Sequence, residues 1–250
     1  MTGERDTGIR RGLDILNCLA GPETPALGGL GVTRLAQLLG QDKSQISRSL
    51  KVLAEYGIIE RDPKTRAYRL GWQLFALAQR SGDQRLLRKA GPVLDDLLGR
   101  LDESVYLSVA NGLEALTVME REPSHAIQAK GGDWPLHATS VGRVLLAGRG
   151  DAEIRALYLA VPPPGGIELL LEQVARTRAD GYSVVIDEFE KGLTAVGAPV
   201  RDASGSVIAA IGVSGPSYRF AQAARAAVAE VVAAAERLGD ALSDAGAHRP

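Results

Sequence analysis

The sequence predicts an α+β protein in two parts: a winged helix-turn-helix near the amino terminus, then a linker helix and a domain that mixes helices and strands. Two short helical patterns separated by a tight turn occupy residues 33–53, and a hairpin pattern follows at 58–70. Charge divides the chain in the same way. Residues 1–85 carry 13 of the 29 Lys and Arg and 9 of the 30 Asp and Glu, which leaves 16 against 21 in residues 86–250. We therefore expect any affinity for nucleic acid in the first part.

The first helix is predicted by Ile9, Leu13 and Leu16, which recur at helical spacing and stop before Gly21. A loop containing Gly and Pro follows over residues 21–31. Cys18 lies in the apolar part of this helix, where a buried small side chain is the simplest interpretation. A single cysteine excludes a disulfide framework within the chain.

The helix-turn-helix is predicted from a helix over Thr33–Leu39, a turn at residues 40–42 and a second helix that begins at Lys43. Asp42 is placed to cap the second helix, and Gln45 is expected to return a hydrogen bond to the N–H of Asp42. Along this helix, polar and cationic side chains share one face, and a second set forms the packing face. The first set is Ser44, Ser47, Arg48 and Lys51; the second is Ile46, Ser49, Leu50 and Leu53.

A wing is predicted after Gly57, with a strand at residues 58–61, a polar turn at 62–66 and a returning strand at 67–70. Lys64 and Arg66 at its tip are candidates for phosphate contacts; a solvated hairpin tip is the alternative.

Arg48 is the strongest candidate for contact with DNA, because a guanidinium can bind guanine in a bidentate manner or clamp a phosphate. Gln45 ranks below it, since a side chain used in capping is less free to bond a base. The full set of candidate DNA-binding residues is Thr33, Lys43, Ser44, Gln45, Ser47, Arg48, Lys51, Lys64 and Arg66.

The rest of the chain alternates between the two periodicities. Helices are expected at residues 72–80 (the linker), 86–101, 168–179 and 221–242, with a further helix that begins near Ser140. Strands are expected at 105–109, 116–119, 182–186, 193–200 and 207–213, and residues 243–250 are expected to be a disordered tail. The predicted domains are residues 8–71, the linker 72–85 and residues 86–245.

Other protein classes find little support. The amino terminus lacks the apolar core of a signal peptide, and no apolar run approaches the ~20 residues that span a bilayer, so a cytoplasmic protein without membrane contact is expected. His125, His137, His248 and Cys18 lack zinc-ligand spacing, and we expect neither metal nor cofactor. The residue types of a hydrolytic triad are present in His137, Ser140 and Asp187, but no Gly-x-Ser-x-Gly elbow surrounds the serine, which argues against a catalytic site there. No catalytic residue is assigned.

Several segments, in their order and spacing, resemble one family. They are Asp42-Lys43-Ser44, Tyr68–Gly71, the run Leu136–Ala147, Gly181-Tyr182, Asp187-Glu188, Gly192-Leu193, Gly197–Asp202, Ala209–Ile211 and Ser214–Pro216. Together they resemble the isocitrate lyase regulator (IclR) family of transcription factors, from about Ile9 to the final helix.

The resemblance implies a rear effector domain with a GAF-like α/β fold and a homodimer or homotetramer on a palindromic double-stranded DNA operator. Pairing is also expected physically, because one helix-turn-helix touches too few base edges to select a genomic site. The first helix and the linker helix are candidates for the dimer contact, although their apolar residues can equally pack within one subunit. The expected function is that of a repressor whose operator affinity is controlled by a small organic or aromatic acid bound in the rear domain. The alternative is a ligand-independent DNA-binding or architectural protein whose rear domain only oligomerises.

Carried over by position, the small-molecule effector site would include Thr139, Ser140, Val141, Val185, Leu193, Ala195, Gly212 and Ser214. Free N–H groups at the start of the helix near Ser140 suit a carboxylate. The alternative makes Ser140 an N-cap and Val185 a core residue. Members that bind small hydroxy or keto acids tend to carry an acid at the place of Val185 and a hydroxyl at the place of Gly212. Their absence predicts a larger, more apolar effector, an aromatic acid or an amino-acid-related metabolite.

Overall fold

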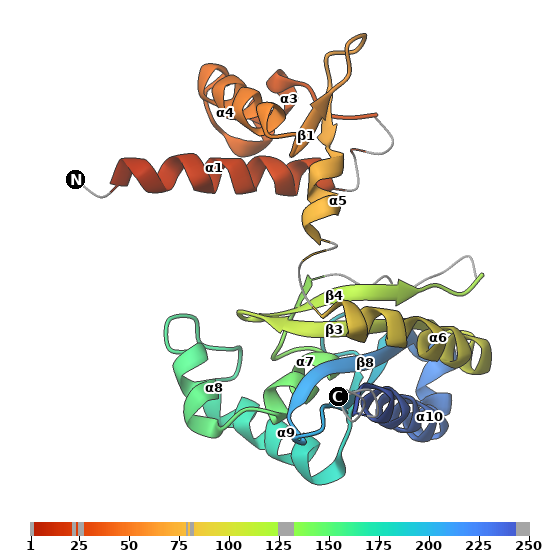
Figure 1. The fold of residues 1–250 in the computed structure, drawn as a ribbon. Helices are drawn as coiled ribbons and strands as arrows, with labels where there is room; N and C mark the ends of the chain where they lie inside the picture. Colours follow the sequence, from red (N-terminus) through yellow and green to blue (C-terminus); the bar gives the residue numbers. More distant parts are fainter. Residues whose placement is uncertain are drawn as a thin grey trace, which may run out of the picture. The chain divides into compact units, whose positions relative to one another are not determined.

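The computed structural model describes residues 3–21, 24, 28–78, 80, 83–124 and 133–243, and the chain divides into two compact units, residues 1–84 and 85–250 (Figure 1). Residues 79, 81 and 82 of the expected linker and 244–250 of the expected tail lie outside the described residues. Each unit has its own core and is described by itself.

The first unit is a helix-turn-helix with a wing. Its elements are α1 (Gly3–Ala20), α3 (Val32–Leu39), α4 (Lys43–Glu55), β1 (Ile59–Arg61), β2 (Tyr68–Leu70) and α5 (Trp72–Ala78). Ile15 of α1, Leu35 of α3, and Ile46 and Leu50 of α4 are fully buried against one another. On α4 the buried positions are those that the helical spacing predicted, whereas on α1 the spacing selected Ile9, Leu13 and Leu16, of which Ile9 and Leu13 are exposed. Hydrophobic burial holds the three helices together.

Local chemistry sets the start of α4. The Asp42 side chain accepts the N–H of Ser44 at 2.7 Å, which confirms its role as the N-cap. Before it, α3 ends at Gly40 in a left-handed conformation, φ 60°, whose N–H bonds back to Ala36 and Gln37. A glycine here allows the sharp reversal between the two helices without a Cβ penalty.

The wing is a two-stranded antiparallel sheet in which Ile59 pairs with Leu70 and Arg61 with Tyr68. Its turn is held by the Asp62 carboxylate, which accepts the N–H groups of Lys64 and Thr65 at 2.8 and 2.7 Å. An isolated bridge between Leu30 and Tyr68 joins the wing to the loop before α3.

The second unit is a six-stranded antiparallel sheet, in the order β5-β4-β3-β8-β7-β6, with helices on both faces (Figure 1). Its strands are β3 (Ser104–Asn111), β4 (Glu114–Arg121), β5 (Asp133–Pro135), β6 (Ser183–Ile186), β7 (Leu193–Arg201) and β8 (Val207–Pro216). Its helices are α6 (Gln84–Leu101), α7 (Ser140–Ala147), α8 (Asp151–Leu157), α9 (Ile167–Asp180) and α10 (Ser217–Ser243).

Strand alternation divides the core of this unit. Val105, Val196 and Val213 face α6 and α10, whereas Tyr106 and Ala210 belong to the second cluster, with α7, α8 and α9. Because successive side chains point to opposite faces, the sequence neighbours of the first set on β7 and β8 are directed toward α7. This geometry decides which strand residues surround the start of α7.

The first turn of α7 packs closely against the backbone of β7 and of Leu136. A Cβ on Gly197 of β7 would lie 2.9 Å from the nitrogen of Val141, and a Cβ on Gly142 would lie 2.3 Å from the carbonyl oxygen of Leu136. Glycine at both positions therefore allows the helix to begin directly on the sheet.

Two of the elements in the described residues were not predicted, β5 and α8, which have three and seven residues. Both are too short for a periodicity to stand out, and β5 exists through its pairing with β4. No helix within the described residues has the length and apolar character needed to cross a bilayer.

Candidate functional site

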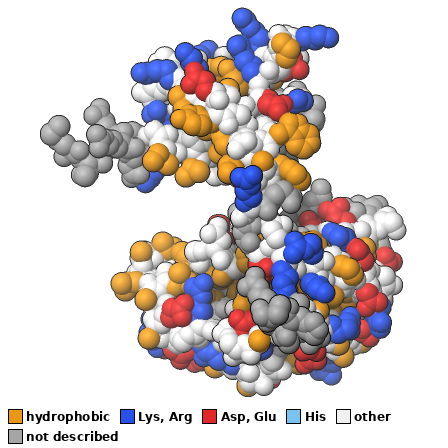
Figure 2. Space-filling view, in the orientation of Figure 1, with side chains coloured by type: hydrophobic (Ala, Val, Ile, Leu, Met, Phe, Trp, Pro, Cys, Tyr) orange, Lys and Arg blue, Asp and Glu red, His pale blue; other side chains and the backbone are white. Residues whose placement is uncertain are grey.

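The polar face of α4 is exposed, as the sequence predicted. Ile46 and Leu50 on the packing face are fully buried. The candidate DNA-binding residues on this helix are exposed to solvent: Lys43, Ser44, Gln45, Ser47, Arg48 and Lys51. Thr33 of α3 and the wing residues Lys64 and Arg66 are exposed as well. In Figure 2, Lys and Arg side chains gather over the wing tip. The helix and the wing thus offer a cationic surface to a polyanion.

Gln45 does not close a capping box, and that expectation was wrong. Its side-chain oxygen Oε1 instead accepts a hydrogen bond from Nη2 of Arg11 on α1, at 2.8 Å. A charged guanidinium is a stronger donor than a neutral backbone N–H, which explains the exchange of partners. Among the described residues, Arg48 makes one long 3.4 Å contact from Nε to the Ser44 carbonyl and lies near the charge of Asp42, so the ends of its guanidinium are available for another molecule.

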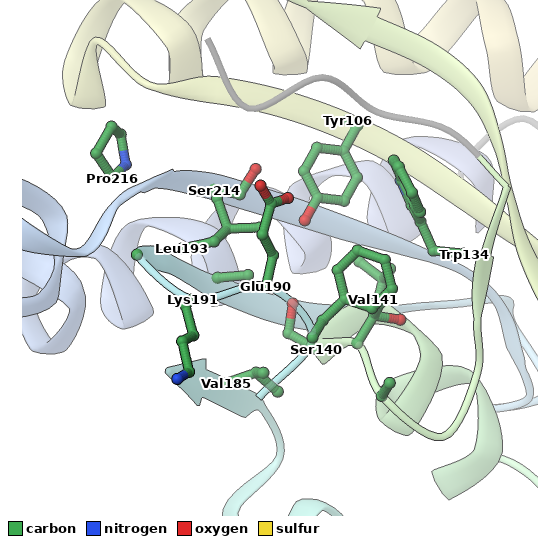
Figure 3. A pocket seen from close by; sticks show the side chains of 15 residues that line it. Tyr106, Trp134, Ser140, Val141, Val185, Glu190, Lys191, Leu193, Ser214 and Pro216 are labelled. Carbon is green, nitrogen blue, oxygen red and sulfur yellow. The ribbon is translucent and has the colours of Figure 1, made fainter. Parts of the chain in front are cut away.

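The second unit contains a pocket of about 330 Å³ at the start of α7 (Figure 3). It brings together seven of the eight candidate effector residues: Thr139, Ser140, Val141, Val185, Leu193, Ala195 and Ser214. Gly212 is the exception. Tyr106 is its partner across β3 and β8, and a Cβ on Gly212 would lie 2.4 Å from the Tyr106 ring. Gly212, which was expected in the lining of the effector site, is instead covered by the tyrosine.

Eight further residues line the pocket and were missed: Tyr106, Trp134, Ala138, Phe189, Glu190, Lys191, Gly192 and Pro216. Ala138, Gly192 and Pro216 lie within segments already singled out, and residues 189–191 lie between two of them, so their sequence position was a usable signal. Tyr106 and Trp134 carried no such signal, because only strand pairing brings them to the site.

One end of the pocket is polar. Thr139, not Ser140, caps α7, since its hydroxyl oxygen accepts the N–H of Gly142 at 3.1 Å. The alternative of Ser140 as N-cap is thereby corrected. Within the described residues, the N–H groups of Ser140 and Val141 have no hydrogen-bond acceptor. Two free donors at the positive end of a helix dipole are suited to a carboxylate.

Three hydroxyls surround this end. Tyr106 and Ser140 direct theirs toward the middle of the pocket, and Ser214 lies beside them (Figure 3). Burial raises the pKa of the Tyr106 phenol, which keeps it neutral and able to donate. The Ser140 hydroxyl is buried and makes no hydrogen bond of good geometry with any described residue. A ligand oxygen would satisfy it.

The opposite walls are apolar. Trp134 and Phe189 meet edge to face with ring centroids 5.0 Å apart, and Val185 and Leu193 add apolar surface; Glu190 and Lys191 also line the pocket. Val185 is only 3 % exposed, so it is both a core residue and part of the wall. An aromatic or branched apolar group fits such walls better than a two-carbon acid does.

An ion pair holds the loop that lines one side of the pocket, and we call it the Arg143 clamp. The Arg143 guanidinium binds both carboxylate oxygens of Glu188, with Nη1 to Oε1 at 3.1 Å, and its Nε donates to the carbonyl of His137 at 3.3 Å. Its side chain is 8 % exposed. Glu188 immediately precedes residues 189–192 of the pocket wall. The clamp therefore ties that loop to α7.

Two residues of the possible hydrolytic triad of His137, Ser140 and Asp187 have other partners. Asp187 accepts hydrogen bonds from the Gly192 N–H and the Ser217 hydroxyl, both at 2.8 Å, and the His137 ring contacts Tyr158 edge to face. No hydrogen bond among His137, Ser140 and Asp187 is found in the described part of the chain. His125 and His248 lie outside it, and the residues it does include hold no group of three His, Cys, Asp or Glu suited to a metal.

Comparison with known proteins agrees with both halves of this geometry. The model of the IclR helix-turn-helix domain matches residues 8–63, and that of the bacterial transcriptional regulator IclR carboxyl-terminal domain matches residues 79–239. The chain belongs to the IclR family. It is therefore a DNA-binding transcriptional regulator, as its relatives are named.

Among the relatives of this IclR-family chain is the regulator BhcR of Paracoccus denitrificans, 30 % identical over 94 % of this chain and 88 % of its own length. XynR of Escherichia coli is 32 % identical over 82 % of this chain and 84 % of its own. A solved IclR homolog from Microbacterium hydrocarbonoxydans, in complex with 4-hydroxybenzoate, superposes with a TM-score of 0.79 at 25 % identity, covering 94 % of this chain and 98 % of that one.

Proposed function

We propose that this IclR-family regulator represses transcription from a palindromic operator, which it binds as a dimer or tetramer through α4 and the wing. We further propose that an aromatic or similarly apolar carboxylate in the α7 pocket controls its operator affinity. Repression is the simpler mode, because a bound protein needs no additional surface to block a promoter.

The observation that carries the effector proposal is the contrast between the two ends of the pocket. Free N–H groups of Ser140 and Val141 and the Tyr106 hydroxyl can bind a carboxylate, while Trp134 and Phe189 provide an apolar wall. Val185 provides no charge or hydrogen bond for a small polar acid. The 4-hydroxybenzoate bound by the Microbacterium homolog supports this ligand class.

Titration calorimetry with benzoate, 4-hydroxybenzoate, pyruvate and glyoxylate tests the ligand class. We expect saturable binding of the aromatic acids alone, and a change in operator affinity when they are bound, because control requires different ligand affinities in the two states. Selective binding of pyruvate or glyoxylate would contradict the proposal. Binding of no acid at all, with operator binding intact, would favour the ligand-independent architectural protein.

The DNA-binding proposal rests on the exposed guanidinium of Arg48. We expect Arg48→Ala to weaken operator binding by roughly 1 to 3 kcal/mol in a mobility-shift titration, with the unfolding midpoint unchanged. Arg225→Ala, which removes an exposed arginine from α10 in the other unit, is the matched control. Equal operator affinity for the Arg48 variant and the wild type would contradict the assignment.

A further inference from the structure

Arg11 of α1 joins the helix-turn-helix by two hydrogen bonds. Its Nε donates to Oε1 of Gln41 in the turn at 2.6 Å, and its Nη2 donates to Oε1 of Gln45 on α4 at 2.8 Å. Arg11 is 30 positions from Gln41 and 34 positions from Gln45 in the sequence, and the fold alone brings the three residues together. In Figure 1, α1 runs alongside the helix-turn-helix.

The chemistry of this contact fixes the orientation of the Gln45 amide. A guanidinium has five N–H donors and no acceptor, so each glutamine must turn its oxygen, and not its nitrogen, toward Arg11. The NH₂ group of Gln45 is then directed away from Arg11, on a residue that is exposed at the start of α4. Gln45 therefore presents its NH₂ donor outward, while Arg11 holds its oxygen.

From this geometry we infer that Arg11 is a positioning residue for DNA recognition, which sets the base preference at the position that Gln45 contacts. The inference rests on the proposed binding of DNA through α4. An outward group that donates favours a guanine edge, whose N7 and O6 both accept, over a cytosine edge, whose N4 donates. A freely rotating glutamine can instead bind adenine by donating to N7 and accepting from N6.

A role limited to stability accounts poorly for the contact. The packing of α1 on α4 already rests on Ile15, Ile46 and Leu50, which are fully buried. The bond to Gln45, by contrast, is exposed, where hydrogen bonds and charges add little to folding. The bond from Arg11 instead fixes the direction of the Gln45 amide on the exposed face of α4.

The test is selection of operator sequences from a randomised DNA pool by the full-length wild type and three variants. Arg11→Met removes the guanidinium, Arg11→Lys keeps the charge without the planar fork, and Gln45→Glu keeps an acceptor for Arg11 but removes the outward donor. Thermal unfolding of each variant verifies that it is folded, and mobility shift measures its affinity.

We expect the wild type to prefer guanine at one position in each half-site. The preference should fall on the order of tenfold in both Arg11 variants, and Gln45→Glu should shift it toward a cytosine or adenine edge. Arg11→Lys should retain most of the affinity. Unchanged preferences at every position in the folded Arg11 variants would overturn the inference, as would uniform weakening without a change in preference, which marks a phosphate contact. A wild type that enriches no sequence would overturn the proposed function and this inference with it.

Discussion

At the scale of single residues, Gly142 is a position where one added methyl group should matter. Its Cβ would lie 2.3 Å from the Leu136 oxygen and 2.5 Å from the Leu136 Cα, both of them backbone atoms that cannot move alone. We expect Gly142→Ala to lower the free energy of unfolding of the second unit by roughly 1 to 3 kcal/mol, as overpacking does. Denaturant titration measures this.

Gly99 offers a matched control for Gly142. It is an exposed glycine of α6 with no heavy atom within 4 Å of an added Cβ. Gly99→Ala should leave stability equal or slightly raised, since alanine is the better helix former. Equal unfolding midpoints for the two alanine variants would show that the helix start tolerates displacement.

His137 predicts a pH dependence. Burial, followed by the charge of Arg143, lowers the pKa of this imidazole from its ordinary 6.5. The unfolded chain then binds the proton more readily than the folded chain, so unfolding free energy rises with pH up to about 6.5 and levels off above it. We expect His137→Gln to remove this pH dependence. The wild type should therefore lose stability relative to the variant as the pH falls below 6.5. A constant difference from pH 5 to 8 would contradict it.

At the scale of elements, the Arg143 clamp predicts that the loop between β6 and β7 controls ligand affinity. Glu188→Gln leaves the buried guanidinium without its charged partner and frees residues 189–192 of the pocket wall. Because Glu188 is 42 % exposed, we expect only about 1 kcal/mol loss of stability, together with several-fold weaker binding of 4-hydroxybenzoate by calorimetry.

The Arg155–Glu168 pair provides the control for the clamp. It joins α8 and α9 in the same unit with a similar two-pronged geometry, but both side chains are largely exposed. Glu168→Gln should leave ligand affinity unchanged. If both glutamine variants weaken binding equally, the effect is one of general charge and not of the loop.

At this scale, the sequence predicted the features that depend on residues close together in the chain. The start of α4 depends on Asp42 and on a periodicity within one helix, and both are readable along the chain. Tyr106 covers Gly212 only because β3 and β8 pair in one register, and the sequence does not contain that register. Gln45 was assigned the wrong partner for the same reason: the local rule named Asp42, whereas Arg11 is 34 residues away.

At the scale of the whole molecule, the first unit leaves apolar side chains uncovered. Ile9 and Leu13 of α1 are 72 % and 57 % exposed and, with Val52 of α4, border an apolar groove. On α5, Trp72 and Phe75 are exposed in an edge-to-face pair. Both expectations for these residues, a contact between subunits and packing within one subunit, stay predictions. Exposed apolar surface of this kind marks a protein contact.

We therefore predict that Leu13→Glu weakens self-association, because a carboxylate placed in the contact loses its hydration. Analytical ultracentrifugation should show a shift toward monomer. Operator affinity should fall with it, because a lone helix-turn-helix reads only half of a palindrome. Leu159→Glu, at a position 83 % exposed in the second unit, makes the same chemical change away from the groove and should alter neither measurement. An oligomer that survives the change at Leu13 and fails with the change at Leu159 would place the pairing surface on the second unit.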